Sequence, residues 1–170
     1  MEGQIQMRRI AFALSIGLFA GACAAQTPQI SRVDVTEYGE YTLEVQTTDQ
    51  TSANGIPQRT VGSVKQLQQT RVIHFHKDLH FGFRYTIVGT PDAADVNIRM
   101  VMVYPAPGLM RPGETTPILR DESTRTRTIG ENYYRGYTIN DDWMMVPGDW
   151  TFELWYGNER IAAETFKLVK

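Results

Sequence analysis

The three histidines of the chain lie within seven residues of one another, at His74, His76 and His80. In an extended strand His74 and His76 point to the same face, because successive side chains alternate between the two faces. A turn through residues 77–79 would bring His76 opposite His80, with cross-strand Cβ atoms about 5 Å apart. Three imidazoles with an open coordination position form a known type of zinc or copper site. The spacing supports a metal-site hypothesis. If residues 74–76 and residue 80 instead belong to different sheets, the histidines would be separated and would simply occupy polar strand positions.

Aromatic residues gather late in the chain and supply a second group of candidates. Residues 150–156 alternate like a strand, which places Trp150 on the apolar face and Trp155 on the opposite, polar face. A ring on a polar face is typical of a contact surface for a protein or a sugar, and Tyr133 and Tyr134 are candidates for the same role. The position of Trp155 is equally consistent with a ring that a neighbouring loop or the stem of Arg160 covers.

The sequence carries no recognisable catalytic or cofactor-binding motif. The acidic pairs 121–122 and 141–142 lack the spacing of an EF-hand loop and are predicted to lie in solvated turns, where aspartate is favoured. There is neither a Gly-x-Ser-x-Gly elbow nor a phosphate-binding Gly-Lys-Ser/Thr loop. We therefore predict no cofactor and rank an enzyme of an unrecognised type below the binding and metal hypotheses.

The composition narrows the class of protein. A length of 170 residues suits one domain with an appendage. The 17 basic and 19 acidic residues are nearly balanced, and the 13 arginines are dispersed, which argues against a nucleic-acid-binding protein. A single cysteine excludes an intrachain disulfide framework.

The first 25 residues have the order of a secretory signal peptide. Arg8 and Arg9 precede an apolar run, residues 10–20, and small residues follow it. The run of 11 residues is too short to cross a bilayer, which needs about 20, and no later segment resembles a membrane span. Translation begins at Met1 or at Met7, which directly precedes the arginines.

The cleavage point of this leader is ambiguous. Residues 20–23 resemble a lipobox, which would make Cys23 a lipid-modified first residue, although alanine stands where leucine is usual. Ordinary small-residue cuts after Ala24 or Ala25 are favoured slightly. We expect residues 26–170 to form one exported domain, in the periplasm or, with a lipid anchor at Cys23, as an outer-membrane lipoprotein.

The mature chain alternates with a period of two. Strong alternation predicts strands in 79–87, 96–104 and 150–156, and in 33–45 with a bend or bulge at Gly39. Weaker patterns predict strands near 71–75, 125–129 and 133–140, with a last strand ending at 169. Only residues 61–69 are candidates for a short helix. About seven strands separated by turns predict an all-β, antiparallel sandwich.

The register of the closing hairpin follows from its apolar face. A two-residue loop at Gly157–Asn158 would turn Phe166 away from Trp150, so we favour a three-residue loop or a bulge near residues 162–163. Either device pairs Trp150 with Phe166, because a single buried face specifies the register.

Three blocks of sequence resemble an uncharacterised bacterial family, domain of unknown function 3859. They are Val-Asp-Val-Thr-Glu-Tyr-Gly-Glu-Tyr at 33–41, Phe-Gly-Phe-Arg-Tyr at 81–85 and Val-Pro-Gly-Asp-Trp-Thr-Phe-Glu-Leu-Trp-Tyr at 146–156. Residues 162–168 also fit, and the resemblance covers most of residues 32–169. It implies an exported, immunoglobulin-like β-sandwich. It implies no activity and no site residues, and the three histidines fall outside the matching blocks.

These observations favour a non-enzymatic, exported domain that binds or organises an envelope protein or glycan. The competing hypothesis is a periplasmic metal-binding protein that uses His74, His76 and His80. The fold alone does not separate the two, since sandwiches carry many unrelated functions.

Overall fold

A computed structural model describes residues 26–51 and 54–170, so the predicted leader and Cys23 lie outside the described part of the chain. The described residues form nine strands and one 3-10 turn. These are β1 (Gln29–Thr51), β2 (Pro57–Gln68), β3 (Val72–His74), β4 (Leu79–Thr90), β5 (Asp95–Val103), β6 (Arg120–Thr128), β7 (Asn132–Ile139), η1 (Asp142–Met144), β8 (Gly148–Tyr156) and β9 (Glu159–Val169). None of the helical structure in this part of the chain is long and apolar enough to span a membrane.

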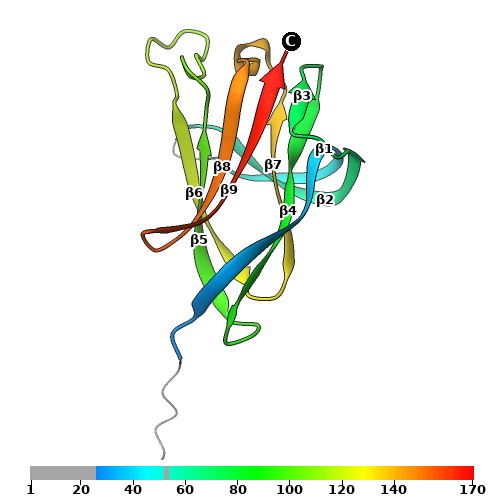
Figure 1. The fold of residues 1–170 in the computed structure, drawn as a ribbon. Coiled ribbons are helices and arrows are strands. Elements are labelled where there is room, and N and C mark those ends of the chain that lie inside the picture. The colour runs from blue at the N-terminus through cyan, green and yellow to red at the C-terminus, as the bar shows by residue number, and fades with distance from the viewer. Residues whose placement is uncertain (1–25, 52–53) are drawn as a thin grey trace, which may run out of the picture.

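The strands form two facing sheets, shown in Figure 1. Sheet A has the order β2-β1-β4-β7, and sheet B has the order β3-β9-β8-β5-β6. The β3–β9 pair is parallel, and the other pairings of the described strands are antiparallel. The all-β sandwich is confirmed, with nine strands where the sequence pattern predicts about seven.

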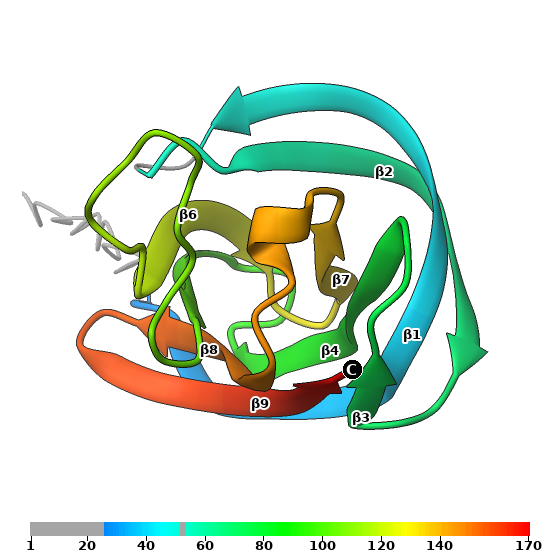
Figure 2. The ribbon, with the colours of Figure 1, turned by 90° about the horizontal axis from the view of Figure 1, so that it is seen from above.

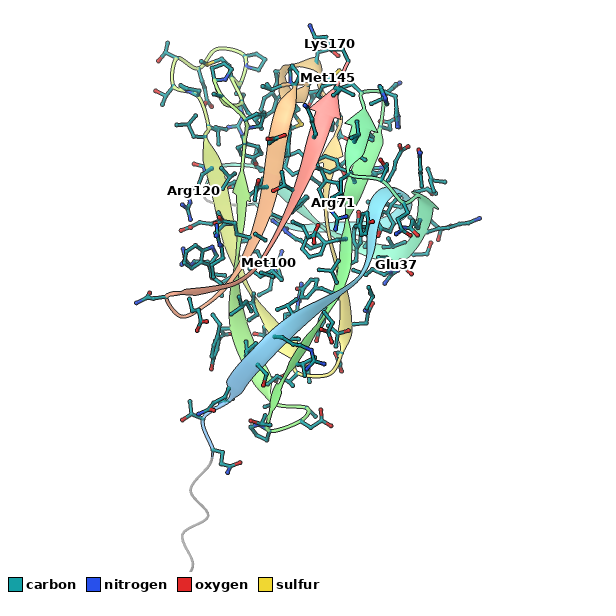
Figure 3. All side chains as sticks on the ribbon, in the orientation of Figure 1. Glu37, Arg71, Met100, Arg120, Met145 and Lys170 are labelled. Atoms are coloured by element: carbon teal, nitrogen blue, oxygen red, sulfur yellow. The ribbon has the colours of Figure 1, made fainter. Side chains whose placement is uncertain are left out.

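The core fills the space between the sheets and includes Met100 of β5, which is labelled in Figure 3. The alternate residues of β4 from Leu79 to Ile87 are fully buried, as their period-two pattern predicts. Trp150 of β8 is also fully buried, and its ring packs against those of Phe81, Tyr104 and Tyr137. Apolar burial of this kind is the main stabilising contribution to such a fold.

Strand β1 belongs to two different pairings. Residues 29–41 pair with β4, whereas residues 40–51 pair with β2. Gly39 lies at this change of partner with a φ of 138°, and a Cβ added there would overlap the carbonyl oxygen of Gln68. The second half of β1 and β2 together form a curved hairpin, here called the β1–β2 arch, which Figure 2 shows bending around β7 and η1 towards β6.

The structure overturns one prediction about local structure and decides between two alternatives for another. Residues 61–69 are not a helix: most of them lie in β2, because pairing with the long β1 strand overrides a weak helical preference. In the closing hairpin Trp150 pairs with Phe166 as predicted. Of the two predicted devices the structure has the bulge, at Ile161, next to the expected residues 162–163, and the loop consists of the two residues Gly157 and Asn158.

Candidate binding cavity

The inner face of β6 is polar. Its interior-facing residues lie opposite buried apolar residues of β5 and alternate with exposed ones. A sandwich normally fills such positions with apolar side chains that interdigitate with the other sheet. In β6 they are Asp121, Ser123, Arg125 and Arg127. Strand β6 therefore lines this side of the interior with charged and polar groups.

A cavity of about 400 Å³ opens beside these side chains. Strands β6 and β7 line it, together with Trp143 and Met144 of η1 and with Leu43 and Val61 of the β1–β2 arch. Met100 adds an apolar surface from β5. The cavity thus lies where the free margins of the two sheets face each other beneath the arch.

The lining carries more positive than negative charge. It includes four arginines and two aspartates, giving an excess of two positive charges: Arg111, Arg125, Arg127 and Arg135, with Asp121 and Asp141. Arg111 forms an ion pair with Glu114, with Nη1 and Oε1 separated by 3.1 Å. The other three arginines come from β6 and β7. The uneven balance favours an anionic ligand.

Arg135 is the most deeply placed of these cations. It occupies an interior-facing position of β7 opposite Phe83 of β4, and its Nε atom is buried. Burial lowers its pKa, while the nearby carboxylate of Asp121 acts in the opposite direction. Arginine remains protonated in proteins even after such a shift. Arg135 is therefore a cation inside the sandwich, with the buried carboxylate of Asp121 in the same cavity.

Arg127 is held in place by aromatic residues. Its Nε donates a 3.1 Å hydrogen bond to the hydroxyl of Tyr85, and its guanidinium carbon lies 4.4 Å from the centroid of the Tyr133 ring. Contacts of this kind fix the direction of a long side chain that would otherwise lose considerable conformational entropy on binding a ligand. Arg127 is consequently preorganised at the cavity wall.

The tip of the β1–β2 arch is fastened to the opposite sheet. Asn54 Nδ2 donates to the carbonyl oxygen of Arg120 at 2.7 Å and to Oδ1 of Asp121 at 3.3 Å. Arg111 Nη2 donates to the carbonyl oxygen of Asn54 at 2.9 Å. The neighbouring Ile56 is buried in the core cluster. These contacts hold the arch across the cavity.

A second, more open hollow adjoins the first. It has a volume of about 450 Å³ and shares Val61, Arg125, Arg127 and Tyr134 with the main cavity. Two predicted binding residues lie here, since Tyr133 and Tyr134 both contribute to its wall. The Tyr134 ring also packs edge-on against Tyr41 at 4.9 Å, and burial raises the pKa of both phenols.

Trp155, the third predicted binding residue, lies elsewhere, on the outer face of sheet B. Its Nε1 donates a 2.9 Å hydrogen bond to Glu153, and the guanidinium of Arg99 lies 4.8 Å from its ring. Arg160 also binds Glu153, at 2.9 Å. The indole is therefore half-buried in contacts within the domain, with Arg99 rather than Arg160 over the ring. The structure does not bring it together with Tyr133 and Tyr134.

The predicted histidine hairpin is wrong. His74 lies in β3 of sheet B and His80 in β4 of sheet A, because β3 pairs with β9 instead of turning back on β4. His76 contacts Glu40, and His80 contacts the hydroxyl of Thr138, each at 2.8 Å. Among residues 26–51 and 54–170, no three His, Cys, Asp or Glu side chains form a group suited to a metal ion. The metal hypothesis thus loses the geometry on which it rested.

The arginine cavity was not predicted from the sequence, although one signal was present. Arg125 and Arg127 alternate with threonines in residues 124–128, a polar period-two pattern without an apolar face. Such a strand must place arginines towards either solvent or the interior, and only the pairing with β5 decides between them. The sequence likewise does not show that Arg135, which lies among the tyrosines of β7, faces the interior.

The two stacked sheets define an immunoglobulin-like β-sandwich, here with a polar cavity at one margin. Residues 30–168 match the family described as domain of unknown function (DUF3859), and the chain belongs to that family. An immunoglobulin-like protein from Pseudomonas aeruginosa is similar in structure, with a TM-score of 0.53 and 17% identity over 86% of this chain and 99% of that one. At this identity the likeness shows the fold alone. No curated protein matches the sequence.

Proposed function

We propose that the protein is a non-enzymatic binding module of the bacterial cell envelope that takes an anionic ligand in the arginine-lined cavity. The observation that carries the proposal is the charged inner face of β6, with Arg125 and Arg127 directed towards the interior and Arg135 on the neighbouring margin of β7.

The energetics of buried charge support an anionic ligand. Removing a cation from water is costly unless an opposite charge compensates it. The lining holds four arginines against two aspartates, and positive charge stays in excess even though Arg111 is paired with Glu114 just outside the lining. A carboxylate or phosphate matches the planar donor geometry of arginine and can accept two parallel hydrogen bonds from it. Aromatic rings and methionines beside the arginines would contact the apolar part of such a ligand.

The envelope location rests on the leader sequence. A charged start, an apolar run of 11 residues and small residues before position 26 are typical of exported proteins. Fractionation of the host cells and intact mass measurement test this part of the proposal. We expect the protein outside the cytoplasm, lacking residues 1–22 with Cys23 acylated, or lacking residues up to Ala24 or Ala25. A full-length cytoplasmic product would contradict it.

Ligand binding can be tested with citrate, glutamate and inorganic phosphate as probes on the protein purified from its host. Binding by at least one of these anions should raise the thermal unfolding midpoint, by about 5–10 °C at a concentration about 100-fold above its Kd. Uncharged glucose should produce no shift.

The double variant Arg125→Gln/Arg127→Gln should weaken binding of the same anion by roughly ten- to a hundredfold, since it removes charge-assisted hydrogen bonds. Arg32→Gln is the matched control, because Arg32 is exposed and paired with Asp34 on β1, outside the cavity. Equal affinities of the double variant and the control would overturn the proposal, as would failure of every anionic probe, small molecule or peptide, to bind the unaltered protein.

A further inference from the structure

The main cavity follows the margin of one strand. Five consecutive residues of β7, 134–138, contribute to its lining. Successive side chains of a strand point to opposite faces, so an opening that touches all five, including Gly136, lies along the edge of the strand. Among the strands that the structure describes, β7 is the last of sheet A and pairs only with β4. Alternate backbone N–H and C=O groups of β7 therefore face the opening.

The second hollow continues along the same edge. Its lining includes Asn132, Tyr133 and Tyr134, and it shares Tyr134 with the main cavity. Together the two hollows follow β7 over residues 132–138, a length of roughly 23 Å at about 3.3 Å per residue. We call this continuous opening the β7 groove. Its length and straight course suit an extended chain better than a compact small molecule.

The charges of the β7 groove repeat with the period of a strand. Arg125 and Arg127 both line the groove from the inner face of β6, two residues apart. Side chains on one face of an extended peptide repeat at the same interval, about 6.6 Å. The lining of the second hollow contains no acidic residue, and its further arginine, Arg84, is already paired with Glu37 at 3.2 Å. A peptide with a carboxylate at every second position would match this spacing.

We propose that the β7 groove binds an extended acidic segment of another protein as an additional strand on β7, with alternate carboxylates directed at Arg125 and Arg127. This inference rests on the proposed function and names its ligand class. Main-chain hydrogen bonds supply affinity in this mode of recognition, and pockets for alternate side chains supply specificity. The leader of the chain does not suit the groove, because Arg8 and Arg9 give it the wrong charge.

The peptide acetyl-(Thr-Glu)4-amide is a suitable probe for calorimetric titration of the protein purified from its host. It should bind at one equivalent, whereas acetyl-(Thr-Lys)4-amide should not bind. Two further versions carry N-methyl groups on either the threonines or the glutamates. In an added strand only every second amide N–H of the peptide points towards β7. The version that is methylated at those amides cannot donate these hydrogen bonds and should bind at least tenfold more weakly than the parent peptide. Equal binding of both methylated versions and the parent would overturn strand pairing.

The same arginine variants complete the test. Arg125→Gln/Arg127→Gln should weaken the Thr-Glu peptide at least tenfold, and Arg32→Gln should leave its affinity unchanged. Binding of citrate, glutamate or phosphate without binding of the peptide would overturn this inference and leave the proposed function intact. Failure of every anion and peptide would overturn both. Light scattering tests a further outcome. A dimer that persists when the peptide is added would identify a second copy of the chain as the occupant and would also overturn the inference.

Discussion

Replacing Trp150 with alanine would remove the largest fully buried side chain of the domain. Its ring centroid lies 5.9 Å from that of Phe81, 5.1 Å from that of Tyr104 and 5.2 Å from that of Tyr137. Its Nε1 donates a 2.9 Å hydrogen bond to the carbonyl oxygen of Val146, which would lose this donor. The substitution therefore removes aromatic contacts from both sheets and leaves a void between them.

The expected loss in the free energy of unfolding is about 3–5 kcal/mol, the usual range for a large aromatic residue truncated in a core. The three ring contacts place Trp150→Ala at the upper end of that range, since each adds about 0.5–1.5 kcal/mol beyond its buried area. Trp155→Ala is the matched control on the opposite face of the same strand. It should cost about 1–2 kcal/mol, because a half-buried ring loses less apolar contact and one cation–π contact worth about 0.5–1 kcal/mol.

Urea denaturation followed by circular dichroism measures both losses. A Trp150→Ala protein that does not fold agrees with the expectation, because the total stability of a small domain is only about 5–15 kcal/mol. Trp150→Phe keeps much of the volume and gives a measurable intermediate value. Losses of equal size at Trp150 and Trp155 would refute the assignment of the two faces of β8.

Two further predictions concern the backbone and a histidine. Gly39→Ala should lower the free energy of unfolding by about 2 kcal/mol or more in urea titration, because a positive φ and overlap with Gln68 both oppose a Cβ; a loss below about 0.5 kcal/mol would contradict it. Both ring nitrogens of His76 face oxygen acceptors, the Lys77 carbonyl and Glu40, and these contacts raise its pKa. The stabilisation by His76 is fully present below about pH 6.5 and is lost as the pH rises through the raised pKa. The advantage in urea midpoint over His76→Gln should thus be larger at pH 5.5 than at pH 8.5, and an equal advantage at both would contradict it.

Much of the sandwich could be predicted because its central strands have one apolar face. Strand β4 buries every second side chain from Leu79 to Ile87, and the pairing of Trp150 with Phe166 follows from the same requirement. Residues 61–69 are a candidate for a short helix because they have no strong period, but pairing with β1 determines their conformation as part of β2. The local hydrophobic pattern of a segment does not show which strand it will pair with.

The site was harder to predict than the fold because it depends on which sheet each strand joins. His74 and His80 are only six positions apart, yet the chain crosses from sheet B to sheet A between β3 and β4. Arg127 and Arg135 are eight positions apart and line one cavity, because β6 and β7 are the margins of different sheets. Aromatic character alone points to Tyr133 and Tyr134, whereas nothing in the sequence directs Arg125 and Arg127 to the interior, because their strand has no apolar face.

The parallel pair β3–β9 determines the order in which the domain can assemble. Val72 pairs with Lys167, which lies 95 positions further along the chain, and β9 lies between β3 and β8 inside sheet B. A chain that emerges from a ribosome or a translocation channel with its N-terminus first cannot complete sheet B until β9 has emerged. Such long-range pairing slows folding, because the entropy of closing a long loop is lost before the contacts form. The topology thus leaves sheet B incomplete until almost the last residue of the chain has emerged, whereas the strands of sheet A are all present once β7 has emerged.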